Sequence, residues 1–195
     1  MYNSTALVAL GANLGAEGLA PVQMIVRALA ALSAAGLPVR AVSRFFRTPA
    51  FPAGSGPDFV NACAAVDPGG RDPEAVLAVL HGIEADLGRV RLTRWGARVI
   101  DLDLLAMGDA ILPDPATEAE WRNLPPETQA QVAPDRLILP HPRLSERGFV
   151  LIPLADIAPL WRHPATGQSV GAMAKALPEA EKAQIWPLSQ RAGAD

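Results

Sequence analysis

The residues best suited to chemistry lie close together, between positions 88 and 105. Four arginines fall within ten residues there, with no acid among them: Arg89, Arg91, Arg94 and Arg98. Two aspartates, Asp101 and Asp103, follow and alternate with leucines. Forked guanidinium groups bind phosphate oxygens two at a time, and neighbouring carboxylates hold one or two Mg²⁺ ions at an oligophosphate. The stretch therefore predicts a site for a magnesium-bound nucleotide.

The two aspartates are predicted to share one face of a strand. Successive strand side chains alternate between faces, so Asp101 and Asp103 project together while Leu102 and Leu104 enter the core. The structural alternative is a surface strand whose acids pair with nearby arginines. The structural alternative for the four arginines is a solvated loop face, although such a face more often includes lysine and glutamate. Trp95 stands among them, and its ring can cover a heterocycle or stack on a guanidinium.

A second candidate group surrounds His141, which lies between Pro140 and Pro142 in a segment that the prolines hold extended. Such a histidine can donate to a phosphate or serve as acid or base, and the alternative is a structural histidine that caps a backbone carbonyl. Arg147 and Phe149 follow closely and add a cation and an aromatic ring. The chain has no phosphate-binding loop that ends in G-K-[ST]. Nucleotide chemistry would therefore depend on arginine and a metal ion.

The composition narrows the class of protein. A chain of 195 residues, half of them apolar and with a net charge of −3, predicts one domain with a sizeable core. That charge gives no reason to expect general binding to nucleic acid or membranes. The single cysteine, Cys63, excludes an internal disulfide framework. No stretch reaches the roughly 18 apolar residues of a membrane span. We expect a cytoplasmic protein that acts as a monomer.

Apolar periodicity and turn residues predict the elements that must position these groups. Strands are expected at residues 5–10, 39–47, 59–66 and 99–105. Helices are expected at residues 19–35 and from Asp72, a good N-cap, to the stop at Gly88. The resulting β-α-β-β-α-β order predicts a ferredoxin-like α+β fold, a mostly antiparallel sheet with both helices packed on one face. The proline-rich stretch 48–57 is predicted to be a loop.

The second half of the chain is less regular. Residues 107–110 resemble a hairpin turn that leads into residues 111–112, and residues 149–154 form a last short apolar segment. Residues 113–134 are rich in proline and read as an insertion, with a short helix at 117–123. We expect the main domain to span residues 1–160. Residues 161–195 would form a C-terminal extension of the same domain, with a helix at 170–177.

Several motifs occur in an order that resembles one known family. They are L-G-A-N-L-G at 10–15, R-T-P at 47–49, D-F-V-N-A at 58–62, R-W-G-A-R-V-I-D-L-D-L at 94–104 and L-P-H-P-R at 139–143. Together they resemble 6-hydroxymethyl-7,8-dihydropterin pyrophosphokinase, over about residues 5–159. The resemblance implies transfer of pyrophosphate from ATP to the hydroxymethyl group of the dihydropterin, with release of AMP. It also implies two Mg²⁺ ions and a ferredoxin-like fold.

The resemblance also assigns roles to individual residues. The metal ligands would be Asp101 and Asp103. The catalytic residues would be these two aspartates together with Arg89 and Arg98. The ATP-binding residues would be Glu84, Arg91, Arg94, Trp95, Arg98, Leu104, His141 and Arg147. The pterin-binding residues would be Thr48, Pro49, Phe51, Phe59, Asn61, Trp95, Asp101 and Phe149. The chain departs from the family pattern at Ala12, where serine is usual, at Ala97, where proline is usual, and at His81, where glutamine is frequent.

These roles agree with the chemistry of the residues. A flat pterin needs aromatic faces above and below, which Phe59 and Phe149 would supply. Its polar edge needs both a donor and an acceptor, which the amide of Asn61 provides. The alternative is a ferredoxin-like module that binds nucleic acid through arginines and aromatic rings. Against it, the net charge is negative, and Asp101 and Asp103 would repel phosphate without a metal. We therefore expect small-molecule substrates and no nucleic-acid or membrane partner.

Overall fold

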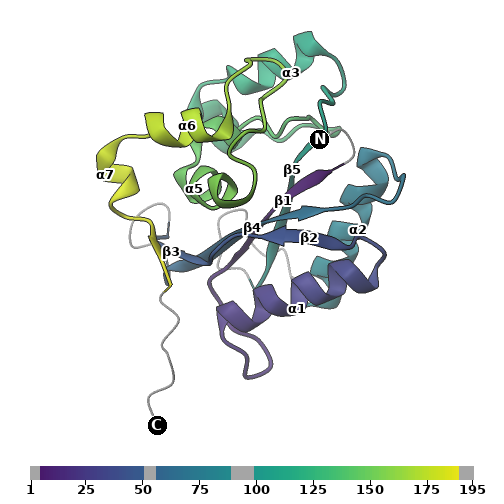
Figure 1. Cartoon of the computed structure of the whole chain (residues 1–195), viewed down its shortest axis with the longest axis vertical. Helices are drawn as coiled ribbons and strands as arrows, with labels where there is room; N and C mark the ends of the chain where they lie inside the picture. The colour runs from purple at the N-terminus through teal and green to yellow at the C-terminus, as the bar shows by residue number, and fades with distance from the viewer. Residues whose placement is uncertain (1–4, 51–55, 89–98, 189–195) are drawn as a thin grey trace.

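An antiparallel sheet with helices on both sides forms the centre of the fold (Figure 1). The structure is a computed structural model that describes residues 5–50, 56–88 and 99–188. Its first half consists of β1 (Ala6–Ala12), α1 (Pro21–Ala34), β2 (Val39–Val42), β3 (Phe46–Thr48), β4 (Phe59–Val66), α2 (Pro73–Asp86) and β5 (Asp101–Met107). The sheet runs β5-β1-β4-β3-β6, where β6 (Trp186–Pro187) comes from the end of the chain, and β2 also pairs with β4. This arrangement confirms the predicted α+β fold.

The strand predicted at 39–47 is divided into β2 and β3 by one serine. Ser43 donates its backbone N–H to the carbonyl of Cys63 at 2.9 Å, as a strand residue would. However, the N–H of Cys63 donates to the Ser43 hydroxyl at 2.9 Å and not to a backbone carbonyl. Because a side chain takes this place in the ladder, the pairing with β4 is interrupted between the two short strands.

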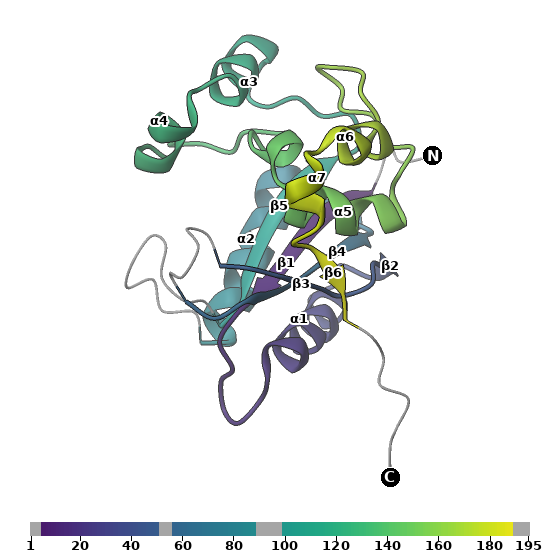
Figure 2. The same cartoon turned by 90° about the vertical axis from the view of Figure 1, so that its left-hand side faces the viewer.

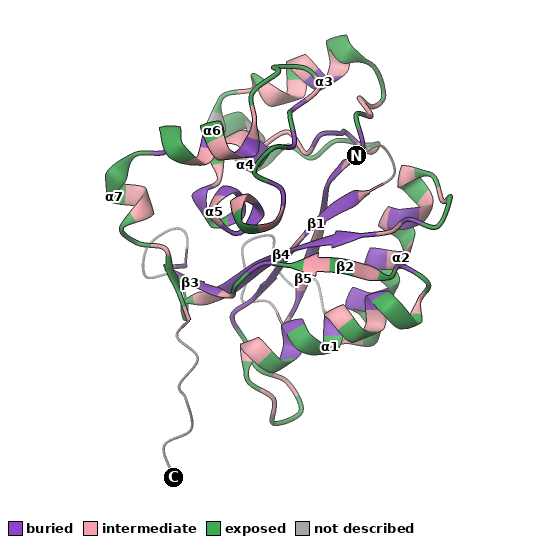
Figure 3. Ribbon diagram, in the orientation of Figure 1, coloured by how far each residue is buried: buried purple, intermediate pink, exposed green. Residues whose placement is uncertain are grey.

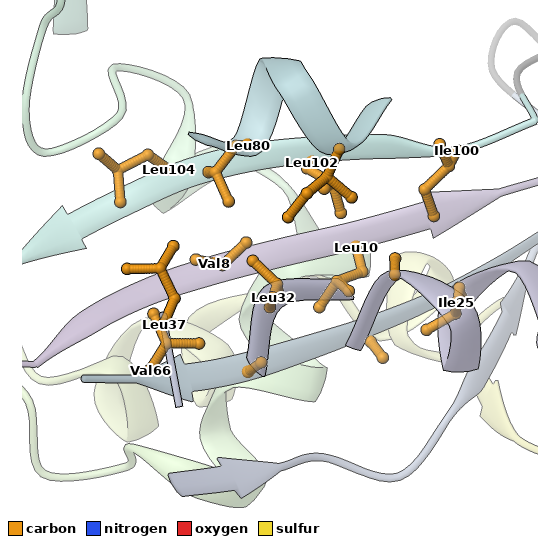
Figure 4. Close-up of a cluster of buried hydrophobic side chains, with 14 of the residues drawn as sticks. Val8, Leu10, Ile25, Leu32, Leu37, Val66, Leu80, Ile100, Leu102 and Leu104 are labelled. Carbon is orange, nitrogen blue, oxygen red and sulfur yellow. The ribbon is translucent and has the colours of Figure 1, made fainter. Parts of the chain in front are cut away.

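Two apolar clusters lie on opposite faces of the sheet (Figure 3). Val8 and Leu10 of β1 face α1 and α2, whereas Leu7 faces the other side, as strand alternation requires. The first cluster continues through Leu80 and Leu102 (Figure 4). The second face is covered by α5 (Gly148–Ile157), and α6 (Val170–Ala176) packs on α5 and extends the same cluster. The apolar segment 149–154 therefore belongs to a helix that packs across the sheet.

The predicted hairpin after β5 is wrong. Gly108 and Asp109 form a turn, but Leu112 pairs with Leu139 through two backbone hydrogen bonds of 2.8 and 3.2 Å. The outer edge of β5 has other partners. The carbonyl of Leu105 accepts the N–H of His141 at 2.8 Å, and burial of Leu139 stabilises the returning segment. Residues 111–112 are therefore drawn away from β5.

Two helices occupy the stretch from 113 to 134, α3 (Pro115–Arg122) and α4 (Pro126–Gln131). The chain then passes through a 3-10 turn, η1 (Leu144–Glu146), to α5. After α6 it forms α7 (Glu179–Lys182) and β6 (Trp186–Pro187), which joins β3 at the edge of the sheet (Figure 2). No helix in the described part of the chain is long and apolar enough to cross a membrane.

Candidate active site

A row of aligned residues crosses the sheet on the face that α5 partly covers. Asp101 on β5 is paired with Gly11 on β1, and Gly11 is paired with Asn61 on β4. A methyl group at Gly11 would come within 2.9 Å of the Asn61 Oδ1 atom. Gly11 is buried and has no side chain, so it forms a floor with a carboxylate on one side and an amide on the other.

The two aspartates share the face that the sequence predicted. Asp101 and Asp103 are half-buried, whereas Leu102 and Leu104 are buried in the core beneath α2. Asp103 lies 3.6 Å from the guanidinium of Arg147. This contact brings an acid of β5 and a cation at the start of α5 to the same place.

Glu84 holds this strand from its outer edge. The side chain is 2% exposed, and its Oε1 atom accepts the backbone N–H of Leu102 at 2.7 Å. Leu102 stands between the two aspartates, so Glu84 helps to fix the segment that presents them. The buried side chain of Leu104 faces the core.

Asn61 and Thr48 form a buried polar pair on the other side of the floor. The Nδ2 group of Asn61 donates to the Thr48 hydroxyl at 2.7 Å, and both residues are buried. Thr48 is also paired with Phe59 across β3 and β4, so all three side chains share one face. The half-buried Pro49 comes directly after β3. The hydrogen bond fixes the orientation of the amide and turns Oδ1 toward Gly11.

His141 is held as a neutral hydrogen-bond donor. Its Nδ1 atom accepts the N–H of Arg143 at 3.1 Å, so the proton of the neutral ring resides on Nε2. Burial lowers the pKa of His141 to about 3, the positive charges of Arg147 and Arg143 act in the same direction, and Asp101 opposes them. At neutral pH the ring therefore offers an uncharged N–H to its surroundings.

Two cations accompany this histidine. The guanidinium carbon of Arg147 lies 5.6 Å from the centre of the Phe149 ring, a cation–π distance, and Phe149 is 37% exposed. Arg143 has a buried Nε atom with no hydrogen-bond partner among the described residues. Arg143 is not among the residues predicted from the sequence, although its place two residues after His141 in the L-P-H-P-R motif was a usable signal.

Part of the predicted site lies outside the described residues. This part comprises Phe51, Arg89, Arg91, Arg94, Trp95 and Arg98. The predicted residues that the structure does describe come from β3 and the residue after it, β4, β5, α2, and the segment from His141 into the first turn of α5. Strand pairing places the predicted residues Thr48, Phe59, Asn61, Asp101 and Asp103 on one face of the sheet. The contact between Arg147 and Asp103 brings the start of α5 to the same face. Glu84 approaches from the other side of β5.

A family model for 7,8-dihydro-6-hydroxymethylpterin-pyrophosphokinase (HPPK) matches residues 7–159. The chain belongs to the HPPK family. An HPPK of Methylorubrum extorquens is 39% identical over 155 residues, which are 79% of this chain and 82% of the relative. An HPPK of Synechocystis is 33% identical over 184 residues, 94% of this chain and 80% of the relative. The protein is thus a pyrophosphokinase that uses ATP, and the nucleic-acid-binding alternative is set aside.

The fold of this chain is similar to that of solved HPPK structures. A crystal structure of Plasmodium falciparum HPPK-DHPS matches 94% of this chain with a TM-score of 0.66 and 14% identity. This chain spans about half the length of that protein, 47% of it. HPPK activity, pyrophosphoryl transfer from ATP to hydroxymethyldihydropterin in folate biosynthesis, is the activity of the family.

Proposed function

We propose that this HPPK binds its pterin across the floor between Asp101 and Asn61, and ATP along the outer edge of β5. The row Asp101–Gly11–Asn61 is the observation that carries the proposal, because it sets a carboxylate and an amide on either side of a residue that has no side chain. A hydroxymethyl group that points away from the amide would then face the two acids.

The pterin pocket is proposed to consist of Thr48, Pro49, Phe51, Phe59, Asn61, Trp95, Asp101 and Phe149. The Asn61 amide would donate to and accept from the polar edge of the ring system, and Thr48 keeps that amide in place. Phe149 is exposed beside Arg147, and Phe59 borders the Gly11 floor at 3.9 Å from the position of an added methyl group. Both rings are therefore available as faces for a flat heterocycle.

Two Mg²⁺ ions are proposed to bind Asp101 and Asp103. Mg²⁺ typically takes one or two carboxylates and completes its coordination with water and phosphate oxygens, and these half-buried acids on one strand face suit that role. No group of three or more His, Cys, Asp or Glu side chains that could hold a metal ion occurs among the described residues. When bound, the ions would neutralise the triphosphate and orient the attacking hydroxyl.

The ATP-binding residues are proposed to be Glu84, Arg91, Arg94, Trp95, Arg98, Leu104, His141 and Arg147. His141 would donate from Nε2 to a phosphate oxygen without adding a charge, and Arg147 would bring a cation beside Asp103. Leu104 would act through its backbone, and Glu84 through the position it gives to β5. We add Arg143, since an anionic ligand would satisfy its buried Nε atom.

Catalysis is proposed to rest on positioning and charge neutralisation, as in other phosphoryl transfers. Arg89 and Arg98 would stabilise the charge that develops on the transferred group. Asp101 and Asp103 are the candidate acceptors of the hydroxyl proton, because they are the described acids on the face that carries Asn61. The arginine-rich stretch would also keep water from the β-phosphorus.

Replacement of Asp103 by alanine tests the metal assignment. We expect AMP release from ATP and Mg²⁺, in the presence of hydroxymethyldihydropterin, to fall by about two to three orders of magnitude. Asp109→Ala is the matched control, since it removes an exposed acid from the turn after the same strand. Circular dichroism checks the fold of both variants. Near-normal turnover by a folded Asp103→Ala variant would refute the assignment.

We also propose that the enzyme works as a monomer in the cytoplasm, where ATP is abundant. Light scattering after size exclusion, at the concentration used for assays, measures the molar mass. A dimer that retains full activity only when associated would contradict this proposal.

A further inference from the structure

The helix that carries the proposed ring and cation begins without a cap of its own. The N-cap residue of α5 is Arg147, which makes no side-chain hydrogen bond to the first turn, and that turn contains no acid. The first backbone N–H groups of a helix lack partners within the helix and carry partial positive charge. α5 therefore needs an acceptor from elsewhere in the chain.

Glu181 on α7 supplies that acceptor from 33 residues away. Its Oε1 atom accepts the N–H of Gly148 at 2.8 Å in a partly buried setting. A methyl group at Gly148 would collide with this carboxylate and come within 3.0 Å of Ile185 Cδ1. Gly148 thus leaves the space that the Glu181 side chain fills.

The bond acts on the peptide unit between the two proposed ligand-binding side chains. The N–H of Gly148 belongs to the peptide that links it to Arg147, and Phe149 is the next residue. The orientation of this peptide sets the directions in which Arg147 and Phe149 leave the backbone. Their observed arrangement places the guanidinium 3.6 Å from Asp103 and 5.6 Å from the Phe149 ring centre.

The segment that carries Glu181 is itself attached on both sides. On its N-terminal side, α7 is linked to the end of α6, because Lys182 Nζ donates to the carbonyl of Lys175 at 2.9 Å. After it, β6 pairs with β3, and Leu188 donates its N–H to Phe45 at 2.8 Å (Figure 2). The carboxylate is therefore presented from a fixed position relative to the sheet.

We infer that Glu181 is a positioning residue for catalysis: its carboxylate caps α5 and thereby orients Phe149 toward the pterin and Arg147 toward the phosphates. This inference rests on the proposed roles of Arg147 and Phe149. It makes the C-terminal extension a working part of the site, although Glu181 itself contacts neither substrate.

Steady-state kinetics of a small set of variants tests the inference. Glu181→Ala should raise the KM for the pterin about tenfold and lower kcat, because the helix loses a charged acceptor. Glu181→Gln keeps an acceptor oxygen and should recover most of the wild-type KM. Glu120→Ala is the control, since it removes an exposed helical carboxylate from α3 and should leave both constants unchanged. Thermal unfolding shows whether each variant is folded.

A double-mutant cycle makes the test specific. Gly148→Ala should reproduce the kinetic defect of Glu181→Ala, and adding it to Glu181→Ala should cost little more, because the carboxylate is already absent. A folded Glu181→Ala variant with wild-type KM and kcat would overturn the inference. Phe149→Ala separates the two levels: if it binds the pterin normally, the proposed pocket is wrong. If Phe149→Ala weakens binding of the pterin while Glu181→Ala does not, only the role of Glu181 is wrong.

Discussion

Gly11 offers a sharp test of the proposed pterin pocket, because a single methyl group there perturbs one defined neighbour. In Gly11→Ala the new carbon would lie 2.9 Å from Asn61 Oδ1, whereas ordinary contacts begin at 3.4 Å. The amide must therefore move by about half an ångström. It cannot do so freely, since Nδ2 is hydrogen-bonded to the buried Thr48 hydroxyl at 2.7 Å.

The size of the effect follows from this displacement. Misplacement of a binding group by about 1 Å can cost about a hundredfold in rate, so half that distance corresponds to about tenfold, or about 1.4 kcal/mol. The net value of a typical buried hydrogen bond, about 1 kcal/mol, leads to a similar figure. We expect the KM for the pterin to rise about tenfold and the KM for ATP to change less than twofold, because Asn61 faces the pterin in our proposal.

The assay is AMP release with one substrate varied at a saturating concentration of the other. Gly82→Ala is the matched control, since Gly82 lies in α2 with nothing within 4 Å of an added methyl group. That variant should keep both KM values and unfold about 2–4 °C higher, as expected when alanine replaces a glycine inside a helix. An unchanged pterin KM in folded Gly11→Ala would refute the placement of the pterin beside Asn61.

Two further predictions concern stability. His141 has a pKa of about 3 in the folded chain and about 6.5 when unfolded, so the unfolded state binds the extra proton between these values. The free energy of unfolding should therefore fall as pH drops from about 6.5 toward 3, by at most about 1.4 kcal/mol per pH unit more than in His141→Asn. Urea unfolding at several pH values measures this slope. Equal slopes for the two proteins would contradict a neutral ring in the folded state. Asp72 caps α2 by accepting the N–H of Ala75 at 2.7 Å, so Asp72→Ala should lower the unfolding temperature by about 2–4 °C, and Asp72→Ser should restore most of it in a thermal melt.

The β-α-β-β-α-β half of the fold was predictable because its signals are local. β4 has the predicted bounds, and α2 begins one residue after the predicted cap at Asp72. The shared face of Asp101 and Asp103 followed from alternation alone, since it needs only the strand and an apolar partner face. Motif order within the chain then pointed to the family that the comparisons identify.

Features that depend on distant partners were not predictable in the same way. The break at Ser43 needs a neighbouring strand that can donate to a hydroxyl. The segment 149–154 has too few residues to separate a helix from a strand by periodicity. Its position also depends on a distant partner, the sheet face on which α5 packs. The Gly148–Glu181 bond joins positions 33 residues apart, and neither residue stands out in the sequence.

The pairing of Leu112 with Leu139 explains how residues 113–134 fit beside a site that demands precision. Two backbone hydrogen bonds close the base of this excursion, and the chain then reaches His141, whose N–H is bound to Leu105 of β5. Because Leu112 and Leu139 are hydrogen-bonded, extra residues between them add a loop-closure entropy that grows only slowly with length. Such residues need not move His141. The same logic applies at the C-terminal end, where β6 and α7 hold Glu181 against α5. Segments that vary in length can therefore join this site only through short, well-anchored contacts, and residues at those contacts are expected to tolerate substitution least.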